Sequence, residues 1–414
     1  MPSYYIWTIG CQMNRAESER LAALLENHGY NSTDHEQDAD LIIINSCVIR
    51  ESAENRVVNK LMRLKHLKTT HPGKKITLTG CFVTSDLADM RRRYPFVDYF
   101  FMAGSTPTFV DLIDVNSYFL PRPAAISSGI TIIQGCNNFC SYCIVPYRRG
   151  REKSRPIDEI EKEARYLVDG GARELVLLGQ NVDSYGHDLE EKSDLADLLE
   201  RINNIENLER IRFLTNHPKD MSMRLIQAMA KLEKVCKQLN LPVQSGDDDI
   251  LQKMERGYTL EHYRKLLNEL RRGVSDVAIT TDIIVGFPGE SAEQFNNTLK
   301  FLEEARFDFV HAAMYSPRPQ TLASRQYVDD VPLAEKVQRR QLVEEVQGKI
   351  AAEVNSNLVG LTVEVLVEGR KKGRWYGRSQ SDKLVFFEHS DNWLGKLAPV
   401  KIEHSSPWFL RGSL

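Results

Sequence analysis

Three cysteines lie within eight residues near the middle of the chain, and their spacing constrains the fold around them more than any other feature. Cys136, Cys140 and Cys143 follow the apolar run 130–133, which places them on a loop after a predicted strand. Three thiolates on one short loop can bind three irons of a four-iron cluster and leave the fourth iron open. The alternative is a structural zinc ion, which needs four protein ligands, and no histidine lies within forty residues after the triplet. The spacing therefore predicts an iron–sulfur cluster whose open iron can bind a small molecule.

The chain has 414 residues, of which 42% are hydrophobic and 27% are charged, and this composition predicts a soluble protein of two or three domains. No stretch approaches the roughly 18 consecutive apolar residues of a membrane span, and the N-terminus lacks the pattern of a signal peptide. We therefore expect a cytoplasmic location and no membrane partner. Seven cysteines in a reducing compartment are better suited to metal binding than to disulfides. The net charge of -3 means that any nucleic-acid site must be a local basic patch.

The first hundred residues alternate between strand and helix patterns, which is typical of an open parallel α/β sheet. The expected elements are strands at residues 4–9, 41–44 and 76–78 and helices at residues 16–28 and 53–67.

Cys11, Cys47 and Cys81 each follow one of these three strands. The carboxyl ends of parallel strands share one edge of a sheet, so cysteines about 35 residues apart can converge there. Gly10 and Gly80 precede two of them and permit a close backbone approach. We therefore predict a second three-cysteine cluster site. The alternative is that each cysteine is a small buried core residue.

A connector is predicted at residues 101–128, with a domain boundary near residue 125, and a second series of strands and helices begins at residue 130. The predicted strands are the one before the cysteine loop and those at residues 174–178, 210–214, 237–241, 277–284 and 307–314. Six parallel strands with outer helices form a partial (β/α)6 barrel, whose active site lies on the loops after the strands. Polar segments follow five of the strands, at residues 179–181, 215–217, 242–246, 285–290 and 316–318.

Two basic segments are candidates for contact with RNA. Arg148 and Arg149 lie just after the cysteine loop and suggest contact with a phosphate backbone or a carboxylate near the reaction centre. The last sixty residues alternate like strands and predict a small β-barrel, whose first strands enclose the basic segment 369–378. Cations and aromatic rings suit single-stranded RNA, and the predicted contacts are Arg370, Lys371, Lys372, Arg374, Tyr376 and Arg378. For both segments the alternative is a solvated charged loop.

The cysteine triplet, with Tyr142 before its last cysteine, resembles the signature of the radical SAM (S-adenosylmethionine) superfamily. Nearly the whole chain resembles the methylthiotransferases, and within them the tRNA-2-methylthio-N6-dimethylallyladenosine synthases. The segments that carry this resemblance are residues 8–14, 45–50, 145–147, 149–150, 154–156 and 212–218. One departure is Asn216, where the family usually has serine.

The resemblance implies three domains: residues 1–120 with an auxiliary cluster, residues 125–355 as the radical SAM barrel, and residues 356–414 as a TRAM-like RNA-binding domain. It implies two 4Fe-4S clusters, one on the catalytic triplet that chelates and cleaves SAM, and one on the N-terminal triplet that supplies sulfur. The hypothesis for the SAM pocket comprises Tyr142, Gly179, Gln180, Gln244, Asp282 and Gly286.

The implied reaction inserts a methylthio group at C2 of N6-isopentenyladenosine at position 37 of tRNA. A 5′-deoxyadenosyl radical would abstract the C2 hydrogen, and a further SAM would methylate the sulfur. The expected partners are the anticodon stem-loop of tRNA and a low-potential electron donor such as flavodoxin or ferredoxin, and the expected state is a monomer. The alternatives are the same chemistry on a ribosomal-protein aspartate or on N6-threonylcarbamoyladenosine in tRNA, and a non-catalytic RNA-binding protein with structural metal.

Overall fold

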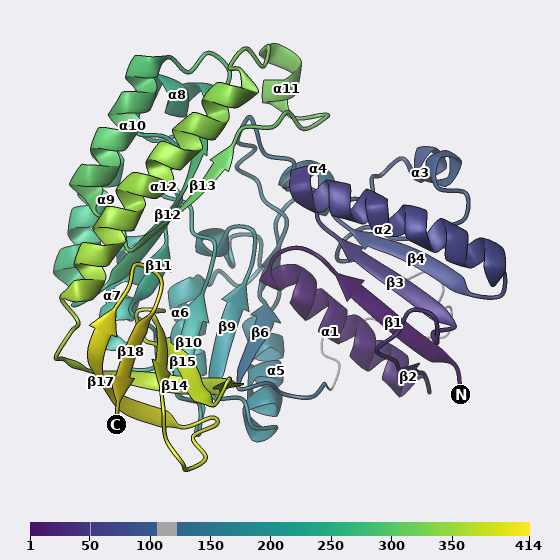
Figure 1. Ribbon diagram of the computed structural model, residues 1–414, viewed down its shortest axis with the longest axis horizontal. Coiled ribbons are helices and arrows are strands. Elements are labelled where there is room, and N and C mark those ends of the chain that lie inside the picture. The colour runs from purple at the N-terminus through teal and green to yellow at the C-terminus, as the bar shows by residue number, and fades with distance from the viewer. Residues whose placement is uncertain (50, 106–121) are drawn as a thin grey trace.

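Three bodies follow one another along the chain, and the computed structural model describes residues 1–49, 51–105 and 122–414 (Figure 1). An N-terminal α/β domain lies beside a central barrel, and a small closed β-barrel at the C-terminus lies against the central barrel as well (Figure 1). Most of the predicted connector, residues 106–121, lies outside the described residues. This architecture confirms the predicted fold class, whereas the predicted domain boundaries stay a prediction.

The N-terminal sheet has the strand order β2-β1-β3-β4-β5, and all of its pairings are parallel. Its elements are β1 (Ser3–Thr8), α1 (Gln12–Asn27), β2 (Asn31–Ser32), β3 (Leu41–Ser46), α2 (Glu51–Thr70), β4 (Lys75–Gly80), α3 (Leu87–Arg93) and β5 (Tyr99–Phe100). Ile42 and Ile44 of β3 pack against α2, while Leu41 and Ile43 pack against α1. Because helices cover both faces of the sheet, its central strand is an uninterrupted apolar run.

The three predicted strands of this domain correspond to β1, β3 and β4 within two residues at each end. The strands β2 and β5 were not predicted. Each has only two residues, which is too short to show the alternation by which a strand is recognised.

Six parallel strands form the central barrel in the order β6, β9, β10, β11, β12 and β13, and a parallel bridge between Ile211 and Val235 joins its two three-stranded sheets. The strands are β6 (Ser127–Thr131), β9 (Glu174–Leu178), β10 (Arg210–Phe213), β11 (Gln238–Asn240), β12 (Ala278–Val285) and β13 (Phe309–Met314). Because β6 and β13 are end strands, the barrel is incomplete, as predicted.

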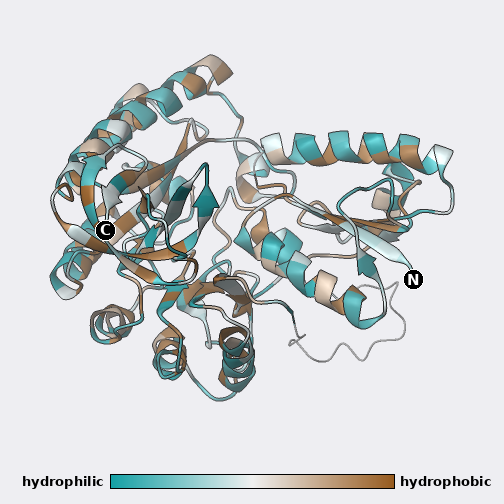
Figure 2. Cartoon of the chain, turned by 60° about the horizontal axis from the view of Figure 1, so that its bottom comes forward, coloured by the Kyte–Doolittle hydropathy of each residue, from teal (hydrophilic) through white to brown (hydrophobic). Residues whose placement is uncertain are grey.

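Helices surround the outside of these strands, and Figure 2 shows that they mix hydrophobic and hydrophilic residues as partly exposed helices do. The helices are α4 (Val145–Arg149), α5 (Ile157–Asp169), η1 (Val182–Ser184), α6 (Leu195–Asn203), α7 (Met223–Lys231), α8 (Asp248–Lys253), α9 (Leu260–Gly273), α10 (Ala292–Ala305), α11 (Leu322–Gln326) and α12 (Leu333–Ser356). Each of the longer outer helices begins at a side-chain cap or a proline; α10, for example, has a capping box at Ser291, and α12 follows Pro332. No helix in the described ranges is both long enough and apolar enough to span a bilayer.

The C-terminal barrel closes in the order β14-β15-β16-β18-β17. Its strands are β14 (Thr362–Lys371), β15 (Arg374–Ser379), β16 (Leu384–Phe387), β17 (Leu397–Ser405) and β18 (Leu410–Ser413). Lys372 and Gly373, with φ of 50° and 82°, form the two-residue turn of the basic β14–β15 hairpin. The buried Arg210 of β10 donates to the carbonyl oxygen of Glu364 at 3.0 Å, which ties this barrel to the central one.

Candidate functional site

The first cysteine triplet lies on the loop between β7 (Ile133–Gln134) and α4. After α4 the chain returns to β7, because β8 (Lys153–Ser154) pairs with β7 in an antiparallel ladder. The loop and α4 therefore lie between two paired strands. Gly135 begins the loop with a φ of 80°, and a Cβ there would lie 2.0 Å from the carbonyl oxygen of Arg151. Only glycine fits this close approach, so the backbone itself holds the loop closed.

Burial raises the pKa of the Cys136 thiol to about 11 and that of the Cys143 thiol to about 12. Burial is the largest cause of both increases, and the charge of the nearby Cys140 sulfur contributes to them. A cation relieves this penalty, because metal-bound cysteine is deprotonated. The thiols of this loop therefore suit a cationic cluster.

The second triplet lies at the carboxyl ends of the neighbouring strands β1, β3 and β4. Cys11 is exposed at the start of α1, whereas Cys47 and Cys81 are buried. Burial, with smaller contributions from the charges of the Cys81 and Cys11 sulfurs, raises the pKa of Cys47 to about 11. The sheet thus brings together three cysteines that are far apart in sequence.

Two glycines and an asparagine pack the backbone around this second triplet. A Cβ on Gly80 would lie 2.3 Å from the carbonyl oxygen of Ser46, and one on Gly10 would lie 2.6 Å from Oδ1 of Asn14. The close approach predicted for both glycines is confirmed. Asn14 is completely buried and donates to Oδ1 of Asn45 at 2.9 Å, while its own Oδ1 accepts from the Cys11 thiol at 3.2 Å.

No three His, Cys, Asp or Glu side chains of residues 1–49, 51–105 and 122–414 converge as ligands of a single metal ion. A zinc ion draws all of its ligands to one point, whereas the three cysteines of a four-iron cluster bind different irons.

Arg148 and Arg149, which were predicted to contact RNA, are both buried. Arg149 donates from Nε to the Cys81 Sγ at 3.3 Å and forms a bidentate pair with Glu17, at 2.5 and 3.2 Å. Arg148 donates to Oε1 of Gln320 at 3.2 Å. The prediction of RNA contacts here needs correction, because the side chains face inward, toward the N-terminal domain and the loop after β13.

Ion pairs join the central barrel to the N-terminal domain around the second triplet. Besides the pair of Arg149 with Glu17, Arg318 after β13 pairs with Glu54 of α2 at 2.6 Å and donates to the carbonyl oxygen of Ile49 at 3.4 Å. Arg122 pairs with Glu19 of α1. We call these three Arg–Glu pairs the interdomain clamp. They hold the second triplet beside the barrel.

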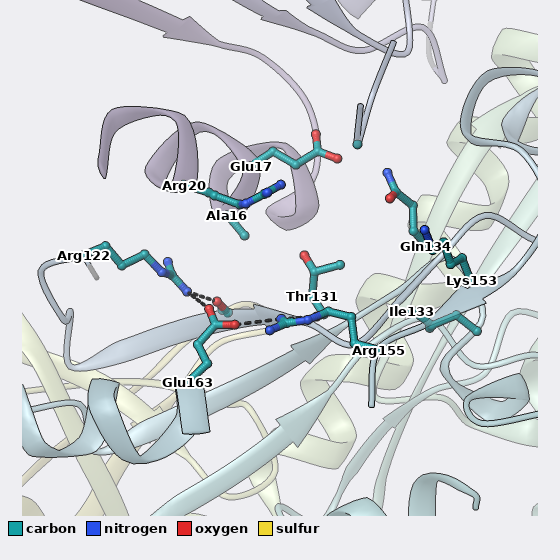
Figure 3. A pocket seen from close by; sticks show the side chains of 12 residues that line it. Ala16, Glu17, Arg20, Arg122, Thr131, Ile133, Gln134, Lys153, Arg155 and Glu163 are labelled. Atoms are coloured by element: carbon teal, nitrogen blue, oxygen red, sulfur yellow. Dashed lines mark hydrogen bonds and ion pairs between the residues drawn. The ribbon is translucent and has the colours of Figure 1, made fainter. Parts of the chain in front are cut away.

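Figure 3 shows a pocket between α1 and β6, which is lined by both domains. Glu163 lies at its base and pairs with Arg155 at 2.7 Å and with Arg122 at 3.2 Å. Glu17 of the interdomain clamp lines the same pocket, whereas neither cysteine triplet does. The pocket therefore belongs to the contact between the domains and not to the cysteine loops.

The residues predicted for the SAM pocket fall into two groups. Oε1 of Gln180 accepts from the backbone N–H of Gly135 at 2.6 Å, and Gly179 packs against Ile133, where a Cβ would lie 2.4 Å from Cγ2. Both therefore support the cysteine loop. Gly286 lies against Lys336, whose Cγ would be 2.4 Å from an added Cβ.

Gln244 and Asp282 form the second group, together with Tyr142. The N–H of Gln244 donates to the carbonyl oxygen of Asp282 at 2.8 Å, and Gln244 has a positive φ of 74°, a strained conformation for this residue type. Tyr142 lies one residue from Cys143, and its hydroxyl accepts from Arg256 at 3.4 Å. Arg256 also donates to the carbonyl oxygen of Pro242 at 2.7 Å, and so links Tyr142 to the loop after β11 that contains Gln244.

Several polar side chains after the strands have buried oxygen atoms that lack a hydrogen-bond partner in the described part of the chain. They follow β9, β10 and β11, and the atoms are Asn181 Oδ1, Asn216 Oδ1, Gln244 Oε1 and Ser245 Oγ. Buried polar atoms are rarely left unsatisfied, so the unpaired amide oxygens of Asn181 and Gln244 suit a ligand with N–H or O–H donors.

Sequence reasoning missed three functional candidates near Cys140. Nε2 of His217 lies 3.8 Å from the Cys140 Sγ, and burial with the nearby Arg256 charge lowers the pKa of His217 to about 2, so its ring is neutral. Asp183 accepts from the His217 N–H at 2.7 Å, and burial raises its pKa to about 7. Arg256 donates to the Cys140 Sγ at 3.3 Å. His217 stood in a predicted polar segment, but no sequence signal marked Arg256.

Three family models match successive parts of the chain. One described as the Radical SAM superfamily matches residues 130–302, one described as Uncharacterized protein family UPF0004 matches residues 3–102, and a TRAM domain matches residues 357–414. Together with the barrel and its cysteine loop, these matches define a radical SAM protein, a class that implies SAM and a 4Fe-4S cluster.

Curated relatives match the chain over its full length. A tRNA-2-methylthio-N(6)-dimethylallyladenosine synthase of Dehalococcoides mccartyi is 54% identical over 414 residues, which are 100% of this chain and 99% of that protein. Proteins of the same name from Roseiflexus sp. and Thermoanaerobacter sp. are 47% and 42% identical, cover 99% of this chain, and are themselves covered to 89% and 92%. The chain belongs to the family of the tRNA-2-methylthio-N(6)-dimethylallyladenosine synthases.

Solved structures share the fold at low identity. The radical S-adenosylmethionine methyltransferase TsrM from Kitasatospora setae aligns with a TM-score of 0.55 and 12% identity, over 98% of this chain and 82% of that one. The cobalamin-dependent S-adenosylmethionine radical enzyme OxsB aligns with a TM-score of 0.53 and 11% identity, over 97% and 65% of the two chains. These likenesses concern the fold alone.

Proposed function

We propose that this protein is a radical SAM methylthiotransferase that inserts a methylthio group at C2 of N6-isopentenyladenosine at position 37 of tRNA. The observation that carries the proposal is the pairing of two cysteine triplets, one at the mouth of the barrel and one on the neighbouring domain. The interdomain clamp joins the two domains around them. Family membership supports the same reaction.

Cys136, Cys140 and Cys143 would hold one 4Fe-4S cluster, and the N-terminal triplet would hold the second. When bound, the first cluster supplies the electron that cleaves SAM to a carbon radical, and the second is the source of the sulfur. The protein's own side chains would bind SAM and hold the cysteine loop in place. The orphaned amide oxygens of Asn181 and Gln244 would accept from SAM, and Gln180 holds the cysteine loop through the Gly135 N–H at 2.6 Å.

The basic β14–β15 hairpin is the part of the C-terminal barrel that we propose to contact tRNA. Arg370, Lys371 and Lys372 are exposed at its tip, and the Arg370 guanidinium lies 5.2 Å from the centre of the Trp375 ring. On the same barrel, the rings of Tyr376 and Phe386 are 6.3 Å apart. Cations for phosphates beside aromatic rings for bases suit a single-stranded loop.

Of the predicted hairpin contacts, Arg374 and Arg378 are partly neutralised. Arg374 pairs with Glu388 at 2.8 Å, and Arg378 pairs with Asp382 at 3.2 Å. We therefore propose that Lys371 and Lys372 contribute more to RNA binding than these two arginines. The low-potential electron donor and the monomeric state stay predictions.

Nucleoside mass spectrometry tests the proposed reaction. Isopentenyladenosine-containing tRNA is incubated anaerobically with reconstituted protein, SAM and a reductant, beside a Cys140→Ala control. The expected product is one methylthio group heavier and absent from the control. Parallel reactions with threonylcarbamoyladenosine-containing tRNA and with ribosomal protein should remain unmodified. Modification of either of these, with unchanged isopentenyladenosine, would move the assignment to that substrate.

A binding titration tests the RNA surface. Replacing Lys371 and Lys372 together by alanine should weaken tRNA binding and reduce the slope of log K against log salt by about 2, because two phosphate contacts are lost. The matched control replaces Lys265 on α9 and Lys349 on α12, two exposed lysines of the central barrel. Equal loss in both double variants would show a non-specific charge effect and remove the hairpin from the proposal.

A further inference from the structure

Each cysteine triplet receives an N–H from one buried arginine. Arg256 donates from Nη1 to the Cys140 Sγ at 3.3 Å, and Arg149 donates from Nε to the Cys81 Sγ at 3.3 Å. Both arginines belong to the central barrel, although Cys81 belongs to the N-terminal domain. The two sites thus share one kind of hydrogen bond, made at the same distance by the same type of donor.

The surroundings of Arg256 leave its charge uncompensated. Its Nε donates to the Tyr258 hydroxyl at 3.0 Å, and its Nη2 donates to the carbonyl oxygen of Pro242 at 2.7 Å. No Asp or Glu among the described residues forms an ion pair with Arg256. Arg256 is only 4% exposed, so water screens its charge weakly.

The surroundings of Arg149 cancel its charge. Its two terminal nitrogens bind the two carboxylate oxygens of Glu17 at 2.5 and 3.2 Å, which is the bidentate arrangement of a strong ion pair. The second triplet therefore receives an N–H from a pair of groups that carries almost no net charge. The two arginines therefore differ in net charge, although each donates an N–H to a ligand sulfur.

We propose that Arg256 raises the reduction potential of the first cluster, and that the Arg149–Glu17 pair leaves the second cluster at a lower potential. This inference rests on the proposed function, in which both triplets hold 4Fe-4S clusters. Reduction adds one electron from an external low-potential donor to the cluster, and no bond forms or breaks in the protein. Hydrogen bonds to the ligand sulfurs and nearby positive charge stabilise the more negative, reduced cluster.

The arginines act as positioning residues, since they touch the cysteine ligands and not the substrate. Because the first cluster would have the higher potential, an electron that enters the protein would reduce this cluster, where SAM is bound. The second cluster stays oxidised while it holds the sulfur. The fold therefore assigns the electron to the site that needs it.

Potentiometric titration followed by electron paramagnetic resonance tests the proposal. Each potential is measured with the cysteines of the other triplet replaced by alanine, so that one cluster remains. Arg256→Gln should lower the equilibrium constant for reduction of the first cluster about tenfold, which corresponds to a fall in its potential of about 59 mV for one electron. Arg149→Gln should also lower the second potential, because the Glu17 charge is then uncompensated, and Glu17→Gln should raise it, because the Arg149 charge is then uncompensated.

The opposite signs expected for Arg149→Gln and Glu17→Gln separate electrostatic tuning from damage to the fold, which would affect both variants alike. Arg264→Gln, on an exposed pair with Glu304, is the control and should leave both potentials unchanged. Should Arg256→Gln fail to bind iron, Arg256→Lys keeps the charge and should shift the potential only slightly.

The iron content of each variant distinguishes a failure of the tuning role from a failure of cluster assembly. Assembled clusters with unchanged potentials in Arg256→Gln and Glu17→Gln would overturn the tuning role and leave the proposed function intact. Failure of the parent protein to assemble either cluster would overturn the proposed function itself.

Discussion

The two cysteine sites differ in how the chain encodes them. The first occupies eight residues of one loop, whereas the second gathers Cys11, Cys47 and Cys81 from the ends of three strands. The first site is a local structure that needs a closed loop, and the second exists only when the parallel sheet has formed. The two proposed cluster sites therefore use the same residue type but depend on different features of the chain, a short motif in one and the sheet topology in the other.

Both sites nevertheless contain a glycine at which the backbone passes close to another backbone segment. Gly135 and Gly80 have φ values of 80° and 90°, and a Cβ on either would lie within 2.3 Å of a backbone carbonyl oxygen. The backbone must approach itself closely to turn thiols inward, whether the turn closes one loop or joins two strands. Only glycine permits this.

The largest expected effect separates the sites by function. Cys140→Ala should abolish SAM cleavage, whereas Cys81→Ala should retain SAM cleavage and abolish methylthio transfer. Each variant should lose about half of about eight irons per chain, because each cluster depends on three thiolates. Iron analysis, 5′-deoxyadenosine formation and nucleoside mass spectrometry measure the three quantities.

Cys236 provides the control for these cysteine variants. It is buried between Arg212 and Glu174 and belongs to neither triplet. Cys236→Ala should retain all of the iron and both activities. Loss of SAM cleavage in Cys81→Ala would show that the two sites do not act separately, and the comparison between them would fail.

The next effect tests the local character of the first site. Gly135→Ala should prevent assembly of the first cluster, because its Cβ would lie 2.0 Å from the Arg151 carbonyl oxygen. Gly150→Ala is closely matched, since its φ is 79° but nothing lies within 4 Å of the added Cβ. It should cost about 1–3 kcal/mol of stability, because its φ of 79° and ψ of −163° lie in a backbone region that is almost restricted to glycine.

Iron content and the thermal midpoint distinguish these two glycine variants. We expect Gly135→Ala to retain about half of the iron with the second cluster intact, and Gly150→Ala to retain all of it. Equal iron loss in both variants would assign the effect to positive φ alone, and not to the close approach that closes the loop.

The sequence predicts the two cysteine sites by different signals. The spacing of Cys136, Cys140 and Cys143 identifies the first site directly, and the strand pattern gives the second by topology. The apolar runs also place five of the six barrel strands within two residues, because buried parallel strands have a simple composition. The first barrel strand was expected at residues 130–133, whereas β6 spans Ser127–Thr131 and the strand directly before the cysteine loop is β7, which lies outside the barrel sheets. What the sequence cannot supply is which distant side chains turn toward these loops.

Arg149 and Arg256 show that limit. Arg149 stands in a basic segment that suggested RNA, yet Glu17, more than a hundred residues away, turns it inward. Arg256 follows α8 with no motif around it, and it reaches Cys140 because the barrel folds the two loops together. Gln180 was assigned to the SAM pocket from its place after β9, whereas its amide holds Gly135.

A smaller effect tests how firmly the second site is held to the barrel. Arg318→Ala removes the pair with Glu54 at 2.6 Å and the contact with the Ile49 carbonyl oxygen, at a cost of about 1 kcal/mol. Faster hydrogen exchange is expected in the first turn of α2. Methylthio transfer should fall a few-fold, while SAM cleavage stays unchanged.

Arg264→Ala is the matched variant for this ion pair, because its pair with Glu304 at 2.7 Å lies outside the contact between the domains. It should change neither hydrogen exchange in α2 nor transfer. An equal fall of SAM cleavage and transfer in Arg318→Ala would show that this contact supports the barrel itself, and not the placement of the second site.

The smallest effect concerns Asn216, at the first site alone. Its Nδ2 donates to Oδ1 of Asp183 at 2.5 Å, while its own Oδ1 is one of the orphaned buried acceptors. A serine hydroxyl can replace the donor, so Asn216→Ser should cost about 1 kcal/mol or less and change the SAM dissociation constant by less than about threefold. Thermal denaturation and equilibrium binding of SAM measure the two effects. A tenfold loss of affinity at unchanged stability would instead mean that the Asn216 oxygen binds SAM directly, and the first site would then depend on side chains after β10 as well as on its cysteine loop.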